Sequence, residues 1–223
     1  MFIVITAVKS TTPTLTHVIP SQGGDSVTAV TSLGDDVFVA RHYSQQVEVY
    51  DAVTLTLQRH LTFPGLGQLP AGLAACPINN CLYASDFNNS LHKDHVHRVE
   101  LSGSNAMKKW SVAIGPVGLS VNSEHNLIVT CSGANKLQEY TTHGSLVREI
   151  CLQAGETQPY HGIQLSTGDY VVSQFKSSGV VSVVGVDGQV VRSYGQSQTS
   201  DVGQMKYPSS LAEIGRASCR ERV

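Results

Sequence analysis

Charged residues are scarce in this chain of 223 residues, and neither sign dominates. Asp, Glu, Lys and Arg make up 14% of the sequence, with 15 basic and 17 acidic side chains and a formal net charge of −2. A nucleic-acid-binding domain usually carries a basic surplus on one face, and a long disordered tail is polar and rich in charge. The composition therefore favours one ordinary globular domain and argues against RNA as its main ligand.

Long apolar runs and targeting signals are missing as well. The apolar run at residues 1–8 is far shorter than the roughly 18 residues that cross a bilayer. It also lacks the basic start and the small-residue cleavage site of a signal peptide. We therefore expect no membrane association and a cytoplasmic location. We interpret the run as a β-strand or as upstream sequence, and treat residues 1–24 as an N-terminal segment of uncertain status.

Cysteine is sparse and shows no metal-binding spacing: Cys131 and Cys151, for example, have no nearby partner. Cys76 and Cys81 flank a Pro-Ile-Asn-Asn turn, so a disulfide across a hairpin is geometrically conceivable. In a cytoplasmic protein we expect both thiols to be reduced. The sequence also has no Gly-x-Ser-x-Gly, His-Glu-x-x-His, phosphate-loop or dinucleotide-binding pattern. It therefore points to none of the common catalytic classes.

The last eleven residues, 213–223, differ from the rest of the chain. They resemble the translation of a sequencing-adapter oligonucleotide and lack the alternating apolar pattern that precedes them. We predict that this segment is not native, the alternative being a natural basic tail, and set it aside before fold reasoning. Without its three arginines and two glutamates, residues 1–212 carry 12 basic and 15 acidic side chains, a net charge of −3.

A repeat of about 45 residues is the main signal in the sequence. Equivalent positions are Thr28, Gly72, Gly118, Gly162 and Ser210, which are 44, 46, 44 and 48 residues apart. Each unit contains short runs rich in Val, Ile, Leu, Tyr and Thr, such as 36–41 and 46–51, that are bounded by turn residues as strands are. No stretch of eleven or more residues has helical apolar spacing. The pattern predicts an all-β protein, a β-propeller of four-stranded antiparallel blades.

The order of motifs within a unit resembles the NHL repeat. Units two and three begin with Pro-x-Gly-apolar, at 70–73 and 116–119, followed by an apolar strand, an Asn/Ser-rich loop and a second apolar strand. The first unit lacks the Pro and Gly, and the second contains an insertion. The resemblance covers residues 25–212 and implies a propeller of nominally six blades. About four blades and a stub of a fifth, at 205–212, are present, so we expect an incomplete ring, a fragment.

The resemblance also implies a binding face, formed by the loops between second and third strands and by the loops that lead to the next blade. Aromatic and polar side chains there suit a protein or peptide ligand, although each is equally compatible with a solvated loop or with packing between blades. The loops to the next blade add Tyr160 and Tyr207. The candidate binding residues are Arg41, His42, Tyr43, Asp86, Phe87, Asn88, Asn135, His161, Gln174, Phe175 and Lys176.

Histidines gather at His92, His95 and His97, where imidazoles and the intervening Asp94 are suitable zinc ligands. The cluster lies in the insertion, and its rings need not converge, so we expect neither metal nor cofactor. His161 lies near the opening of a central channel. Some six-bladed propellers are metal-dependent lactonases or amidating lyases, but one histidine makes neither a metal site nor an acid–base pair. We predict no catalytic residue.

These features predict a non-catalytic scaffold for protein interaction, of the NHL-repeat type. The resemblance to the C-terminal domain of tripartite-motif proteins implies the substrate-recognition part of a ubiquitin ligase. Two alternatives stay open: a six-bladed propeller enzyme of the lactonase or lyase type, and an RNA-binding NHL domain. The candidate face offers just Arg41 and Lys176 as basic residues in its strand-connecting loops, which counts against RNA. The sequence does not indicate an oligomeric state.

Overall fold

The computed structural model describes residues 2–4, 17–19, 26–66, 70–87, 94–103, 106–153, 158–175, 179–195 and 207–211. Within these ranges the chain consists of β-strands, turns and short connections, and contains no helix. The tail at 213–223 lies outside the described residues, as do the candidates Asn88, His92 and Lys176. What the sequence predicts for those positions therefore stays a prediction.

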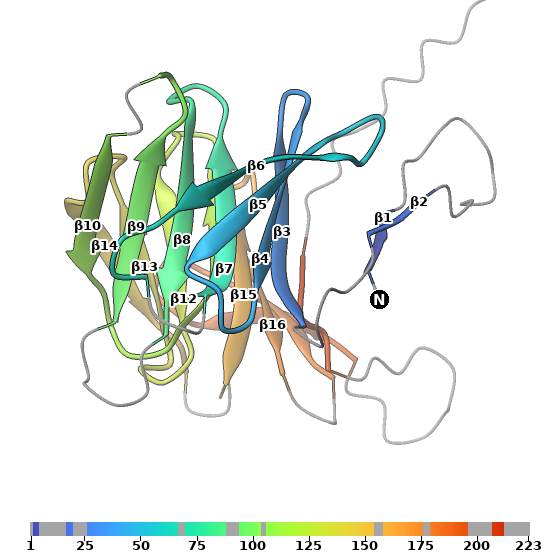
Figure 1. Cartoon of the computed structure of the whole chain (residues 1–223). Coiled ribbons are helices and arrows are strands. Elements are labelled where there is room, and N and C mark those ends of the chain that lie inside the picture. The colour runs from blue at the N-terminus through green and yellow to red at the C-terminus, as the bar shows by residue number, and fades with distance from the viewer. Residues whose placement is uncertain are drawn as a thin grey trace, which may run out of the picture.

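The repeat units form four antiparallel sheets of four strands, and the strands of each sheet follow one another in chain order (Figure 1). The all-β fold predicted from the repeat, with four-stranded antiparallel blades, is confirmed. Blade 1 contains β3 (Val27–Leu33), β4 (Asp36–Arg41), β5 (Gln46–Asp51) and β6 (Leu57–Thr62). Blade 2 contains β7 (Pro70–Cys76), β8 (Cys81–Asp86), β9 (His95–Glu100) and β10 (Met107–Ser111).

Blade 3 contains β11 (Pro116–Val121), β12 (Leu127–Cys131), β13 (Lys136–Tyr140) and β14 (Leu146–Cys151). Blade 4 contains β15 (Pro159–Gln164), β16 (Tyr170–Gln174), β17 (Val181–Val184) and β18 (Val190–Tyr194). A separate two-stranded sheet pairs β1 (Phe2–Val4) with β2 (His17–Ile19). The apolar run at the start of the chain thus contributes a strand of three residues.

Polar turns join the first and second strands of the blades. Gly34 and Gly168 adopt positive φ angles of 57° and 95° in these turns, and Asn80 has a φ of 40°. This left-handed region is accessible to glycine at little cost and is tolerated best by asparagine among the other residues. Gly or Asn therefore takes the left-handed position of this turn in blades 1, 2 and 4, whereas in blade 3 His125 takes it, with a φ of 64°.

Apolar side chains fill the spaces between adjacent blades. The largest buried ones are Phe38, Phe63 and Leu82 between blades 1 and 2, Tyr83, Leu127 and Tyr140 between blades 2 and 3, and Leu137, Ile150 and Tyr170 between blades 3 and 4. Full burial of one such side chain contributes roughly 1.5–3 kcal/mol. Each blade is therefore held mainly by its neighbours.

Glycines let the inner strands approach one another closely. The inner strands β3, β7, β11 and β15 pack against each other in chain order. A Cβ atom on Gly118 would lie 2.9 Å from the Cα of His161 and would also collide with the carbonyl oxygen of Tyr160. A Cβ on Gly162 would lie 2.9 Å from Leu137 Cδ2. The recurring glycine of the sequence repeat therefore marks the contact between neighbouring blades.

Candidate binding site at the channel mouth

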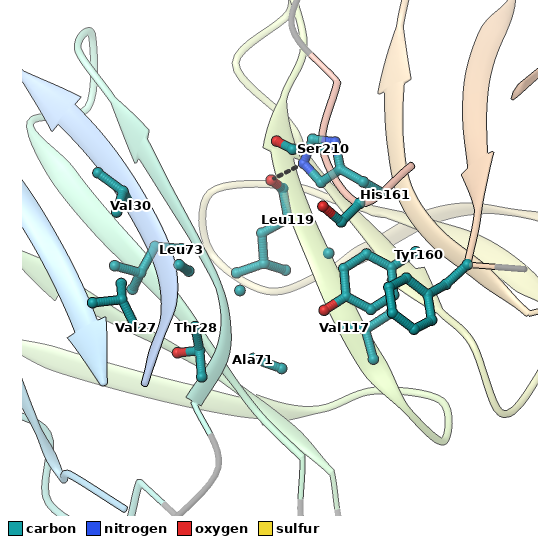
Figure 2. Close-up of a pocket in the computed structure, with 15 residues that line it drawn as sticks. Val27, Thr28, Val30, Ala71, Leu73, Val117, Leu119, Tyr160, His161 and Ser210 are labelled. Carbon is teal, nitrogen blue, oxygen red and sulfur yellow. Dashed lines mark hydrogen bonds between the residues drawn. The ribbon is translucent and has the colours of Figure 1, made fainter. Parts of the chain in front are cut away.

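The four inner strands line a central cavity of about 450 Å³ (Figure 2). Its wall consists of Val27, Thr28, Ala29, Val30, Ala71, Gly72, Leu73, Val117, Gly118, Leu119, Tyr160, His161, Phe175, Ser209 and Ser210. None of these wall residues is Asp, Glu, Lys or Arg. The described wall of the channel thus carries no fixed charge, and its polar groups are hydroxyls, backbone atoms and one imidazole.

The cavity opens at the loops between the second and third strands. A second hollow of about 450 Å³ shares part of the cavity wall and adds Ser26, His42, Pro70 and Phe87. His42 follows the last residue of β4, and Phe87 follows the last residue of β8. We call this hollow the channel mouth. It lies on the face that the resemblance to NHL repeats implies for ligand binding.

His161 ties three segments of the chain together. The backbone N–H of Leu211 donates to its Nδ1 at 3.2 Å, so Nδ1 carries no proton. The proton therefore sits on Nε2, which donates to the carbonyl oxygen of Leu119 at 3.0 Å (Figure 2). Burial lowers the pKa of His161 below its ordinary value of 6.5, and the hydrogen bond to Leu119 opposes that shift. The ring is neutral at pH 7, and both of its nitrogens are engaged.

Three aromatic rings are in contact beside the channel. The ring centroids of Tyr160 and Phe175 are 4.9 Å apart with an interplanar angle of 28°, a stacked pair, and those of Phe175 and Tyr207 are 5.1 Å apart with the rings tilted by 47°. Phe175 is 44% exposed and Tyr207 is 49% exposed. Contacts between aromatic rings stabilise their positions. The three rings therefore present a contiguous aromatic surface to solvent.

Several residues near this face have a positive φ angle, as do Leu55, Asn80 and His125 in turns elsewhere. Tyr43 has a φ of 63°, Tyr207 a φ of 52° and Asn135 a φ of 50°. A positive φ is tolerated by Asn but is unusual for a bulky side chain, and such strain is found preferentially at functional sites. Tyr43 is 65% exposed and packs edge-to-face on His42, with ring centroids 4.2 Å apart. Two exposed tyrosines are thus held in costly conformations.

The structure brings some of the candidate residues together and separates others. His42 and Phe87 line the channel mouth, and His161 and Phe175 line the cavity. In contrast, Arg41, Asp86 and Gln174 are buried, with 4%, 4% and 2% exposure, at the ends of strands β4, β8 and β16. Asn135 is partly buried, and its Nδ2 donates to the carbonyl oxygen of Leu152 at 3.4 Å.

Sequence reasoning missed two features. Ser26 and Val27 line the mouth although their sequence context is unremarkable. The second feature is that Asp86 and His97, which the sequence names as candidates for different sites, form a pair, with side-chain atoms 3.9 Å apart across β8 and β9. The signal that could have found this pair is its equivalence, by strand position, to Arg41 and Glu48 in blade 1.

The structure describes two of the three clustered histidines, His95 and His97, and both cysteines of the β7–β8 hairpin. His95 and His97 lie on β9 with ring centroids 6.4 Å apart, and no group of three or more His, Cys, Asp or Glu side chains in the described part of the chain is arranged to hold a metal ion. Cys76 and Cys81 are register partners across the β7–β8 hairpin, and both are buried and free. Burial raises the pKa of the Cys81 thiol, which makes it a poor nucleophile.

The sheets and the cavity define a β-propeller protein. Neither a scan of known protein families nor a search of curated proteins finds a match. Among solved structures, hydrazine synthase of Kuenenia stuttgartiensis is 20% identical, with a TM-score of 0.62 over 80% of this chain and 51% of that chain. Virginiamycin B lyase of Staphylococcus aureus is 14% identical, with a TM-score of 0.64 over 82% of this chain and 59% of that one.

A chain of a nidogen/laminin complex is 16% identical, with a TM-score of 0.63 over 82% of this chain and 67% of that chain. This chain therefore spans between about half and two thirds of the propellers compared. Identities this low establish the fold alone, and the fold serves both lyases and a binding platform. Over the described residues there is no helix with the length and apolar character that a bilayer crossing needs.

Proposed function

We propose that this protein is a non-catalytic recognition module that holds a protein or peptide ligand at the channel mouth. The observation that carries the proposal is the uncharged hollow at the mouth, two of whose lining residues contact exposed aromatic side chains: His42 packs against Tyr43, and Tyr160 stacks on Phe175. Binding hot spots are enriched in tyrosine, because its rigid ring covers a large area at a small entropic cost. The mouth therefore suits an apolar or aromatic anchor on a partner.

Two further observations support recognition by this face. The nidogen/laminin structure is that of a complex between proteins and has the same fold. The resemblance to NHL repeats implies a ligand on the same side of the blades. We extend the proposal on that basis: the module is the substrate-recognition part of a tripartite-motif-like ubiquitin ligase, and it acts in the cytoplasm.

The alternatives have less support in the described residues. A propeller enzyme needs a reactive group in the channel, but both ring nitrogens of His161 are engaged and the described wall has no carboxylate. RNA binding needs available cations, but Arg41 is buried and its Nε lies 2.9 Å from Glu48. Recognition of a protein or peptide is therefore placed ahead of catalysis and of RNA binding.

Selection from a random peptide library displayed on phage tests the proposal. Peptides selected on the wild-type chain should bind at least about tenfold more weakly to a variant that combines Tyr43→Asn, Phe175→Ser and Tyr207→Asn. Asparagine is used at the two positive-φ positions because it tolerates that conformation.

The matched control removes exposed apolar side chains elsewhere, by combining Val53→Ser, Ile78→Ser and Val186→Ser at positions that are 77%, 70% and 57% exposed. This control should bind the selected peptides with unchanged affinity. Equal affinity for the wild type and the triple aromatic variant would contradict the proposal, because binding would then not use the exposed aromatic side chains beside the channel mouth.

A further inference from the structure

A short segment of the cavity wall is held in place by few contacts. Residues 207–211, which we call the channel segment, form no strand. In the described part of the chain, one hydrogen bond joins this segment to a blade, from the backbone N–H of Leu211 to His161 Nδ1 at 3.2 Å. At the other end of the segment, the ring of Tyr207 contacts that of Phe175. The channel segment is therefore attached to blade 4 at two points.

The ring of His161 is fixed as a neutral acceptor toward this segment. The ring packs against Gly118, where an added Cβ would lie 3.0 Å from the ring Cδ2. Its Nε2 donates to the carbonyl oxygen of Leu119 at 3.0 Å, so the lone pair of Nδ1 is left to accept from Leu211. A second proton on the ring must bind at Nδ1. Two N–H groups would then face each other, and the attachment of the channel segment at Leu211 would be lost.

No carboxylate faces His161 to offset such a proton. The strands that contact β15, which are β11, β12 and β16, contain no Asp, Glu, Lys or Arg, and neither do the channel segment and the rest of the cavity wall. Thiols and phenols ordinarily titrate above pH 8, so imidazole is the group here whose charge changes between pH 5 and 8. Burial lowers the pKa of His161, because a cation is poorly solvated there. The other titratable side chains on these elements are Cys131, Tyr160, Tyr170 and Tyr207.

We propose that His161 is a pH-sensitive switch: when Nδ1 takes up a proton, residues 207–211 leave the channel. The hydrogen bond to Leu119 survives, because the protonated ring still donates from Nε2 and a charged donor bonds more strongly. Water then takes the place of the Leu211 N–H and solvates the cation. Tyr207, which has a strained φ of 52°, leaves with the segment. Ligand binding at the channel mouth therefore weakens in acid, a step that rests on the proposed function.

NMR of the ¹⁵N-labelled full chain between pH 7.5 and 5 tests the switch. The ring ¹⁵N signals report the protonation of His161, and amide exchange, corrected for the intrinsic rate at each pH, reports the protection of Leu211. This protection should fall at least about tenfold as the ring takes up its proton. His161→Asn keeps an uncharged oxygen acceptor near the position of Nδ1 and should retain the protection. The control His60→Gln changes an exposed histidine of blade 1 and should behave as the wild type does.

Two outcomes in the wild type alone would overturn the switch, so the test does not depend on the folding of a variant. One is a His161 ring that stays neutral down to pH 5 in the folded chain. The other is unchanged protection of Leu211 once the ring is protonated.

The link to recognition is tested separately, with a selected peptide that has no His, Asp or Glu. Its affinity should fall at least about fivefold between pH 7.5 and 5 for the wild type, and should stay constant for His161→Asn. Release of the channel segment without loss of affinity would exclude Tyr207 from the binding site and leave the switch intact. An equal loss in His161→Asn would assign the pH dependence to another group, such as His42 at the channel mouth, and would overturn the link.

Discussion

The interfaces at the two ends of the row of blades are built differently. Between blades 1 and 2, the contact consists mainly of apolar side chains such as Phe38, Phe63 and Leu82. Between blades 3 and 4, side-chain hydrogen bonds are added to the apolar core. Ser120 Oγ donates to the carbonyl oxygen of Gly162 at 2.7 Å, and Asn122 Nδ2 donates to Gln164 Oε1 at 2.7 Å.

A buried carboxylate organises the second interface. Glu139 is fully buried, and its oxygens accept from Asn122 Nδ2 at 3.1 Å, Asn126 Nδ2 at 2.8 Å and Arg148 Nε at 2.8 Å. The hydroxyl of Tyr170 in blade 4 donates to the same carboxylate at 3.4 Å. Apolar contacts are not directional, whereas hydrogen bonds fix distance and angle. The interface between blades 1 and 2 therefore holds the two blades together, and the interface between blades 3 and 4 also fixes their relative orientation.

The largest loss of stability should come from removing a side chain from the apolar interface between blades 1 and 2. Leu82→Ala removes a side chain with no exposed surface and should lower the free energy of unfolding by about 2–5 kcal/mol. Urea denaturation followed by circular dichroism measures this loss. Leu57→Ala, at a position that is 44% exposed, is the control and should change stability by less than about 0.5 kcal/mol. Equal effects of both variants would contradict the proposed role of this interface.

The second largest loss of stability is expected from a substitution where β11 and β15 approach each other closely. Gly118→Ala places a methyl group against the backbone of Tyr160 and His161, which cannot move away as a side chain could, so a loss of about 3 kcal/mol is expected. Thr28→Ser is the control, since the equivalent position of blade 1 already has a side chain, and it should be nearly neutral. A neutral Gly118→Ala would show that the blades separate easily.

A smaller loss is expected at the polar interface. Asn122→Ala removes donors from Glu139 and Gln164 and should cost about 1–2 kcal/mol. A double-mutant cycle with Gln164→Ala sharpens the comparison, because residues in direct contact couple by at least about 0.5 kcal/mol. Additive effects in this cycle would mean that the hydrogen bond across the two blades does not help to orient them.

The smallest effect concerns pH. Burial lowers the pKa of His161, so the folded chain resists protonation while the unfolded chain takes up a proton near pH 6.5. The stability that the neutral ring contributes is present above pH 6.5 and is lost as the pH falls below that value. Melting temperatures measured between pH 7.5 and 5 should therefore fall less in His161→Gln than in the wild type. His60→Gln, which changes an exposed histidine, should retain the wild-type slope.

Local pattern was enough to predict the strands. The runs at 36–41 and 46–51 are β4 and β5 with the same bounds, because both are rich in β-branched and aromatic residues and end at turn residues, and 46–51 also alternates in polarity. The repeated glycine also predicted the inner strands. The close contact between neighbouring inner strands calls for glycine once per blade, so the glycine recurs with the length of a blade and leaves a periodic trace in the sequence.

The burial of several candidate site residues could not be predicted in this way. Arg41, Asp86 and Gln174 are polar and stand next to loops, which suggested exposure, but each is the last residue of a second strand and is buried there. Alternation along a strand gives the side of the sheet on which a residue lies. The alternation does not reveal whether a polar partner, such as Glu48 for Arg41, lies on the same side of the sheet.

Contact between inner strands in chain order has a mechanical consequence. Because each blade is held by its neighbours, stability behaves as a sum of blade terms and junction terms along a line. A defect at one junction then releases the segment beyond it while the remainder keeps its fold. We therefore expect the blades to unfold one after another, starting at the least stable junction. A substitution beside β7 should change the local stability of β15 little.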